Sequence, residues 1–143
     1  MQNKNIEKAL KIAYKAHENQ FDKGGEPYIN HPLHIAKMLN CEDEIITALL
    51  HDVMEDSNIT KKDLIDFGFN ENVINALSCL TRKRNEDYFS YINKIKSNIL
   101  AKKIKILDLE HNLDIKRLSK ITNKDLQRIE KYKKALAILK KDR

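Results

Sequence analysis

The sequence has 143 residues, of which 41% are hydrophobic and 34% are charged, and its formal net charge is +6. This length is enough for one folded domain with a real core, and no apolar run approaches the length that spans a membrane. With three Gly, two Pro and no Trp, the composition favours long helices and argues against a sheet-rich fold.

The net positive charge favours anionic partners, although much of it lies in the last third of the chain. The two cysteines, Cys41 and Cys79, are too few for a disulfide framework and form no CxxC motif. A reduced, cytoplasmic setting is therefore expected. The N-terminal residues lead into no apolar core of the kind that a signal peptide has. We expect one domain over residues 1–143, without a membrane segment.

The first part of the chain predicts two helices separated by a loop. Apolar residues at helical spacing predict a helix over residues 4–19, with His17 near its end. Residues 20–32 hold most of the Gly and both Pro, which predicts a loop, and loops on rigid scaffolds often carry function. A second helix is predicted from Pro32 to Leu39, because Pro suits a first helical turn. His31 would then lie in a fixed position at the entry of this helix.

Four polar residues follow the apolar run 45–50, namely His51, Asp52, Glu55 and Asp56. On a continuous helix His51 and Glu55 would share one stripe, and Asp52 and Asp56 would share the neighbouring stripe. A His-Asp pair on the buried side of a helix has to be paired, protonated or metal-bound. The alternative interpretation is the C-terminal end of a helix with ordinary exposed acids.

Further helices are predicted along the rest of the chain, and we find no reliable strand pattern. Asp43 is expected to cap the helix that carries the His-Asp pair, and Asn123 to cap the last helix. Between them, helices are expected from Thr60 to near Gly68, from Asn70 to near Thr81, from Tyr88 to about Ser97, and from Leu100 through His111. Apolar residues crowd both sides of Asp108, which indicates a buried helix and a dedicated partner for this carboxylate. The chain is therefore predicted to be an all-α bundle.

A basic loop separates two of these helices. Residues 81–85 are polar and include the consecutive cations Arg82, Lys83 and Arg84. Such a run is usually a solvated link, and the other interpretation is that it meets phosphate. The Lys residues of the last helix are most simply its solvated face.

Four candidate metal ligands lie on three separate segments: His31, His51, Asp52 and Asp108. Two imidazoles and two carboxylates suit a borderline divalent cation such as Mn²⁺, Fe²⁺ or Zn²⁺. Spacing along the chain does not establish that these residues converge. His34 competes with them as a ligand, and we expect it to be a packing or surface residue instead.

Several motifs together give a family resemblance. They are His17-Glu18-Asn19-Gln20, Gly25-Glu26-Pro27-Tyr28-Ile29-Asn30-His31-Pro32, Leu50-His51-Asp52-Val53-Met54-Glu55-Asp56 and Lys105-Ile106-Leu107-Asp108-Leu109-Glu110-His111-Asn112. In order and approximate spacing they resemble the HD superfamily of metal-dependent phosphohydrolases. The closer resemblance is to the (p)ppGpp hydrolase domain of RelA/SpoT proteins and to small alarmone hydrolases. It runs from about residue 6 to residue 135 and implies an HD-domain bundle of about seven to eight helices.

The resemblance also implies roles for particular residues. Its metal ligands, usually for one Mn²⁺, correspond to His31, His51, Asp52 and Asp108. The carboxylates that position or activate the attacking water correspond to Glu55 and Asp56, and the nucleotide contacts to Lys23 and Asn112. The implied reaction removes pyrophosphate from the 3′ position of guanosine tetra- or pentaphosphate, ppGpp or pppGpp. The expected partner is thus a nucleotide, and nucleic acid is not expected.

Two positions depart from the family pattern. Asp22 and Asp114 stand where the family usually has basic residues, near the expected base or phosphates. Asp22 could face solvent, read the edge of a guanine, or signal a less phosphorylated substrate. Two alternative functions therefore remain: an HD phosphohydrolase for another nucleotide such as NADPH, and a non-catalytic module that binds nucleotides or nucleic acid.

Overall fold

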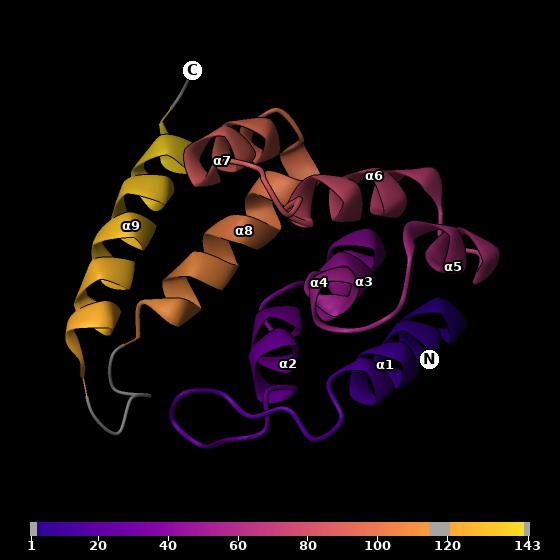
Figure 1. Cartoon of the computed structure of the whole chain (residues 1–143). Coiled ribbons are helices and arrows are strands. Elements are labelled where there is room, and N and C mark those ends of the chain that lie inside the picture. The colour runs from indigo at the N-terminus through magenta and orange to yellow at the C-terminus, as the bar shows by residue number, and fades with distance from the viewer. Residues whose placement is uncertain (1–2, 115–120, 142–143) are drawn as a thin grey trace.

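The computed structural model describes residues 3–114 and 121–141, in which helices surround the central helix α3 (Figure 1). The helices of these ranges are α1 (Lys4–Ala16), α2 (Asn30–Ala36), α3 (Glu42–Leu50), α4 (Val53–Asp56), α5 (Lys61–Asp66), α6 (Glu71–Leu80), α7 (Tyr88–Lys96), α8 (Ile99–Asn112) and α9 (Asn123–Lys140). The β-type pairing found among the described residues is an isolated bridge between Phe21 and Pro27. The predicted all-α fold is confirmed, and α4 is a single turn that the sequence interpretation had joined to α3.

No helix in the described part of the chain has the length and apolar character needed to cross a membrane. The cytoplasmic location and the organisation as one domain stay predictions.

Local capping explains where several helices begin. The Asn3 side chain accepts hydrogen bonds from the backbone N–H groups of Asn5 and Ile6 at the start of α1. Asn70 caps α6 by accepting from the N–H of Val73, as predicted. Thr60 was predicted to begin a helix, and it caps α5. These contacts satisfy backbone donors that have no partner within the helix.

Two predicted caps are wrong. Helix α9 is capped by Thr122 rather than Asn123, because Thr122 and Asp125 form a reciprocal capping box. Helix α3 begins after Cys41, and Asp43 lies inside its first turn. An acid at that position still stabilises the helix through its interaction with the helix dipole.

The two N-terminal helices differ from their predicted bounds. Helix α1 ends at Ala16 with His17 as its C-cap, so it is shorter than residues 4–19. Helix α2 begins at Asn30 and ends at Ala36, so His31 lies within its first turn and is buried. Pro32 fits this turn because the backbone N–H that Pro lacks would have no partner within the helix there.

Helix α3 is the buried centre of the fold. Its residues Ile46, Thr47, Ala48, Leu49 and Leu50 are all buried. It packs against α1, α2, α6 and α8. It also contributes to both apolar clusters of the core, one shared with α1, α5 and α6 and the other with α7, α8 and α9. The C-terminal end of α3 is therefore fixed between the two parts of the core, and the His-Asp pair follows directly.

Candidate metal centre

The helix that carries the His-Asp pair is interrupted at the pair itself. His51 is the C-cap of α3 and Asp52 is the N-cap of α4. The His51 ring donates from Nδ1 to the carbonyl oxygen of Ala48 at 2.7 Å. In a continuing helix the Ala48 carbonyl would accept from the N–H of Asp52. The His51 side chain uses this acceptor instead, so the series of helical hydrogen bonds ends there. The expectation of one continuous helix through Asp56 is therefore wrong, although His51 and Asp52 remain adjacent to the helix end.

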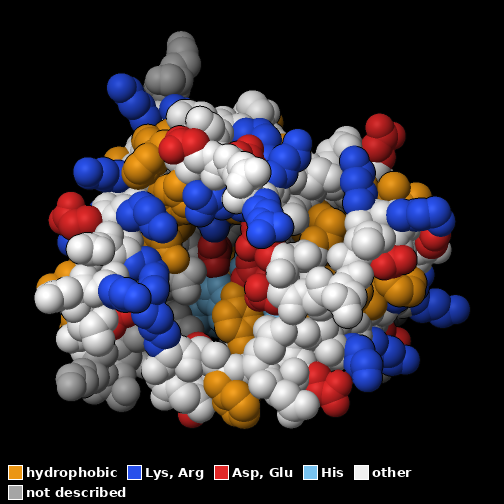
Figure 2. All heavy atoms as spheres, viewed as in Figure 1, with side chains coloured by type: hydrophobic (Ala, Val, Ile, Leu, Met, Phe, Trp, Pro, Cys, Tyr) orange, Lys and Arg blue, Asp and Glu red, His pale blue; other side chains and the backbone are white. Residues whose placement is uncertain are grey.

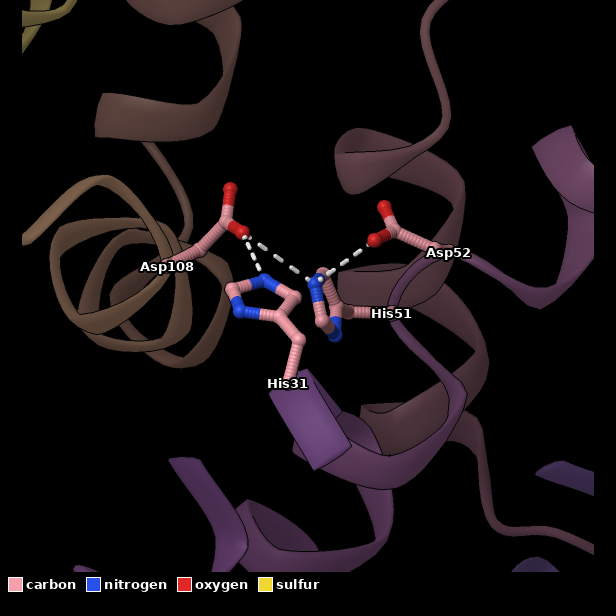
Figure 3. Close-up of side chains that lie close together, drawn as sticks. All are labelled: His31, His51, Asp52 and Asp108. Atoms are coloured by element: carbon pink, nitrogen blue, oxygen red, sulfur yellow. Dashed lines mark hydrogen bonds and ion pairs between the residues drawn. The ribbon is translucent and has the colours of Figure 1, made fainter. Parts of the chain in front are cut away.

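Four side chains converge on one point (Figure 3). Asp108 Oδ1, on α8, lies 2.6 Å from His31 Nε2 and 3.3 Å from His51 Nε2. His51 Nε2 lies 3.0 Å from Asp52 Oδ2. One donor atom from each residue can be chosen so that all four lie within 4.8 Å of one another. The structure thus brings together the four residues that the sequence analysis selected.

Each of the two imidazoles is held through its Nδ1 atom, which leaves Nε2 directed at the shared point. His51 Nδ1 donates to the Ala48 carbonyl, and His31 Nδ1 lies 2.7 Å from His111 Nδ1. His51 Nε2 is buried and has no hydrogen-bond partner of good geometry among the described residues. The hydroxyl of Tyr28 donates to Asp52 Oδ2. Outer contacts of this kind orient metal ligands, and the donor set fits a divalent ion.

The charges of the centre keep its carboxylates ionised. Burial by itself would raise the pKa of Asp108, but the charge of Lys105, the hydrogen bond from His31 and the nearby His51 ring hold it well below its usual range. Lys105 Nζ donates to Asp108 Oδ2 at 2.9 Å. Burial also opposes ionisation of Asp52, yet His51 lowers the pKa of this carboxyl to about 2. Both carboxylates are therefore available as anionic ligands at neutral pH.

Glu55 and Asp56 lie one turn beyond the centre and are not part of the four-residue cluster. Glu55 Oε1 accepts a hydrogen bond from the N–H of Arg82 at 2.6 Å. Asp56 Oδ2 lies 3.9 Å from His17 Nδ1. Burial raises the pKa of both carboxyls, and the charge of Asp52 adds to the effect. A raised pKa makes each carboxylate a better proton acceptor.

A cavity of about 290 Å³ opens between the 20–28 loop and α9. Both predicted nucleotide contacts, Lys23 and Asn112, line it. Asn112 also donates to Asp108 Oδ1 at 3.1 Å, so it joins the cavity to the metal centre. Lys23 is paired with Asp125 at 2.8 Å, a partner that lies far away in the sequence. Arg128 and Tyr132 of α9 also line the cavity, and the sequence analysis did not select them.

Asp22 has a structural role that the sequence did not suggest. Its Oδ1 accepts hydrogen bonds from the N–H groups of Gly24 at 2.9 Å and Glu26 at 3.0 Å. These bonds hold the turn in which Gly25 has a positive φ of 86°, a conformation that Gly adopts without strain. Asp22 and Asp114 also line the cavity, so both departures from the family pattern border the space where a ligand would lie.

Three residues of the centre were missed as functional candidates: Tyr28, Lys105 and His111. All three belong to the motifs that carried the family resemblance, which was the available signal. His34, in contrast, lies outside the four-residue cluster, and its ring stacks on His111 with centroids 3.9 Å apart. Its interpretation as a packing or surface residue agrees with this contact.

The family model described as the HD domain matches residues 9–142. The chain belongs to the HD domain family. The resemblance to the HD superfamily is thereby confirmed at the family level. The His51-Asp52 pair belongs to one of the motifs that carried this resemblance.

Three curated relatives match part of this HD domain protein. A protein of Haemophilus influenzae named guanosine-3′,5′-bis(diphosphate) 3′-pyrophosphohydrolase is 35% identical over 71% of the chain. A protein of Borreliella burgdorferi with the same name is 39% identical over 55% of the chain, and a GTP pyrophosphokinase of Myxococcus xanthus is 30% identical over 76%. The chain spans only 12%, 17% and 16% of the Borreliella, Haemophilus and Myxococcus proteins, respectively.

A solved structure, described as a metazoan ortholog of SpoT that hydrolyzes ppGpp, has the same fold. The TM-score is 0.77, with 97% of this chain and 86% of that chain covered. The sequence identity is 21%, so this likeness establishes the fold of the HD domain.

Proposed function

We propose that this HD domain protein is a metal-dependent hydrolase that removes the 3′-pyrophosphate from ppGpp or pppGpp. The observation that carries the proposal is the convergence of His31, His51, Asp52 and Asp108 beside a cavity that Asn112 joins to Asp108. The names of two curated relatives support the same reaction. In this reaction water attacks the 3′-diphosphate, and the products are pyrophosphate and GDP from ppGpp or GTP from pppGpp.

In this proposal the four clustered residues bind one divalent ion, most simply Mn²⁺. Two imidazole nitrogens and two carboxylate oxygens form a mixed donor set that suits such an ion. A bound divalent ion would lower the pKa of water and neutralise charge on a phosphate oxygen. Lys105 and Tyr28 would hold Asp108 and Asp52 in place through their hydrogen bonds.

Glu55 and Asp56 are proposed to orient the attacking water and accept its proton. The hydrogen bond from the Arg82 N–H fixes the Glu55 carboxylate at the rim of the centre. Burial raises the pKa of Glu55, which makes its carboxylate a better proton acceptor. Lys23 and Asn112 are proposed to contact the nucleotide, because both line the adjacent cavity.

One observation favours a different substrate for the same chemistry. The carboxylates of Asp22 and Asp114 line the cavity, and carboxylates repel phosphate groups. Another phosphorylated nucleotide, such as NADPH, is therefore the second candidate. A non-catalytic module that binds nucleotides or nucleic acid has less support, since Glu55 and Asp56 would have no role in it.

A product assay tests the proposal. The protein is incubated with Mn²⁺ and a panel of nucleotides that includes ppGpp, pppGpp and NADPH, and the products are separated and identified. We expect pyrophosphate and GDP from ppGpp, with Asp108→Asn as the inactive control. Turnover of NADPH alone would favour the second candidate. Turnover of no nucleotide, together with salt-sensitive binding of DNA or RNA, would favour the binding module.

A further inference from the structure

Two cations gather around one aromatic ring beside the proposed centre. The Lys131 ammonium of α9 lies 4.5 Å from the centroid of the Tyr88 ring. The Arg82 guanidinium lies 5.3 Å from the same centroid. Arg82 comes from the basic loop 81–85, whose possible contact with phosphate the sequence left open. The structure thus brings part of that loop against the basic face of α9.

Among the residues that the structure describes, these cations have no anionic partner. In the described part of the chain, neither Arg82 nor Lys131 forms an ion pair with a carboxylate, and the Arg82 side chain donates from Nε to the Glu86 backbone carbonyl at 3.0 Å. Burial lowers the pKa of Lys131, and the charges of Arg82, Arg128 and Lys105 lower it further. Like charges held together in this way are stabilised by an anion that binds between them.

Tyr88 supplies a second observation at the same place. Its hydroxyl oxygen is buried and has no hydrogen-bond partner among the described residues. A phenol is a good hydrogen-bond donor, and buried polar groups without a partner are uncommon. Its ring also lies 6.5 Å from that of Tyr132, which lines the cavity proposed for the nucleotide. The cluster of Arg82, Tyr88 and Lys131 is therefore next to the cavity rather than on a remote surface.

The cluster also adjoins Glu55, one of the two proposed catalytic carboxylates. The N–H of Arg82 donates to Glu55, and an open groove is lined by Glu55, Arg82, Lys83 and Arg84. Figure 2 shows Lys and Arg side chains along the edge of a hollow, with acidic and His side chains lying inside it. A ligand that reaches the metal centre would thus meet positive charge on this side.

We propose that Arg82 and Lys131, around Tyr88, form a binding site for a diphosphate group beside the metal centre. The inference rests on the proposed function, and where the occupant is a 5′-diphosphate it narrows the substrate class to nucleotides that are phosphorylated at two positions. The occupant is a diphosphate, which could come from either of two sources. It is the 5′-diphosphate of the substrate or the pyrophosphate that the reaction releases.

Charge removal with matched controls tests this site. The test variant is the double substitution Arg82→Gln and Lys131→Gln, which removes two charges and keeps polar side chains of moderate length. The control variant is Lys133→Gln with Lys134→Gln, which removes two charges from exposed positions of the same helix. A third variant, Arg82→Lys with Lys131→Arg, keeps the charges and should behave as the wild type does.

The steady-state readout separates the two sources of the diphosphate. If the site holds the 5′-diphosphate, the test variant should raise KM for ppGpp about tenfold or more, with little change in kcat. KM for guanosine 3′-diphosphate, which lacks the 5′ phosphates, should not change. If the site holds the released group, inhibition by pyrophosphate should weaken instead, by a similar factor. Unchanged KM values together with unchanged pyrophosphate inhibition would overturn the proposal.

A binding measurement separates failure of this site from failure of the proposed function. Inorganic pyrophosphate is titrated calorimetrically into metal-free wild-type protein and into each variant. Binding to the wild type and to the control, but not to the test variant, would support the site even if ppGpp were not hydrolysed. Hydrolysis of ppGpp with equal pyrophosphate affinity and equal KM in all variants would leave the function standing and remove the site.

Discussion

The Nδ1 atoms of His31 and His111 lie 2.7 Å apart, so only one of the two nitrogens carries the shared proton. If His31 uses Nε2 as a metal ligand, its Nδ1 carries this proton and donates to His111. The two rings are stacked, with an interplanar angle of 7° and centroids 4.9 Å apart. His111 would then orient His31 by accepting this hydrogen bond, and we assign it as a positioning residue.

Removing the His111 ring should weaken metal binding. We expect His111→Ala to lower the affinity for Mn²⁺ by about 10- to 100-fold, the usual effect of losing an outer contact to a ligand. His111→Asn should retain more affinity, because its amide oxygen can still accept from His31. His34→Ala is the control, since it removes only the outer ring of the stack. Equal affinity in His111→Ala and wild type, measured by calorimetry, would contradict this role.

The four-residue cluster should account for the bound metal. Asp52→Ala and Asp108→Asn should each lose most of the Mn²⁺ after dialysis, because each removes one anionic ligand. Metal content is measured by elemental analysis, with Asp66→Asn as a control for an acid paired at the surface with Lys62. Full occupancy in both cluster variants would show that the ligand assignment is wrong.

Glu55 should affect the rate and leave the metal in place. Glu55→Gln keeps the acceptor for the Arg82 N–H and removes the basic carboxylate. We expect turnover of ppGpp to fall roughly 100-fold or more, with unchanged metal content. Glu18→Gln is a suitable control, because Glu18 is an exposed acid that pairs with Lys15. Unchanged turnover in Glu55→Gln would make Glu55 a structural residue.

Metal affinity should rise with pH. Burial by itself would lower the pKa of His51, but Asp52 and Asp108 raise it well above its usual value in the metal-free protein. A metal that binds Nε2 has to displace this proton, so protons compete with the metal until the pH exceeds the raised pKa. We expect affinity for Mn²⁺ to increase over the pH range above the ordinary imidazole pKa of about 6.5, with proton release detected calorimetrically in two buffers. An affinity that is constant over this range would contradict the prediction.

The sequence was sufficient for the approximate places of most helices and, together with the family resemblance, for the four clustered residues, but not for their outer contacts. Helical periodicity and capping are local signals, which is why Thr60 and Asn70 were placed correctly. The break after Leu50 was missed because it depends on the His51 side chain competing for a backbone carbonyl. The Lys23–Asp125 pair depends on how the 20–28 loop meets α9, and no local pattern contains that information.

The Asp22 carboxylate combines two effects that substitution can separate. Its Oδ1 atom accepts two backbone hydrogen bonds that hold the loop, and its charge borders the cavity. Asp22→Asn retains an oxygen acceptor and removes the charge, whereas Asp22→Arg removes both. A carboxylate 4 Å from a phosphate costs about 1 kcal/mol in water and more where water is excluded, and about 1 kcal/mol is roughly a fivefold change in affinity.

We therefore expect Asp22→Asn to lower KM for ppGpp several-fold, and Asp22→Arg to lose part of that gain because the turn is loosened. The measurement is steady-state hydrolysis of ppGpp and NADPH by the wild type and both variants, with thermal unfolding as the check on the loop. A loss of activity on guanine nucleotides alone would mean that the carboxylate reads the base edge. A gain for ppGpp of the expected size would measure the repulsion between this carboxylate and the phosphates, whereas faster turnover of NADPH than of ppGpp by the wild type would favour the second candidate. No change for any nucleotide would limit Asp22 to its role in the turn, and the main objection to ppGpp would then lose its physical basis.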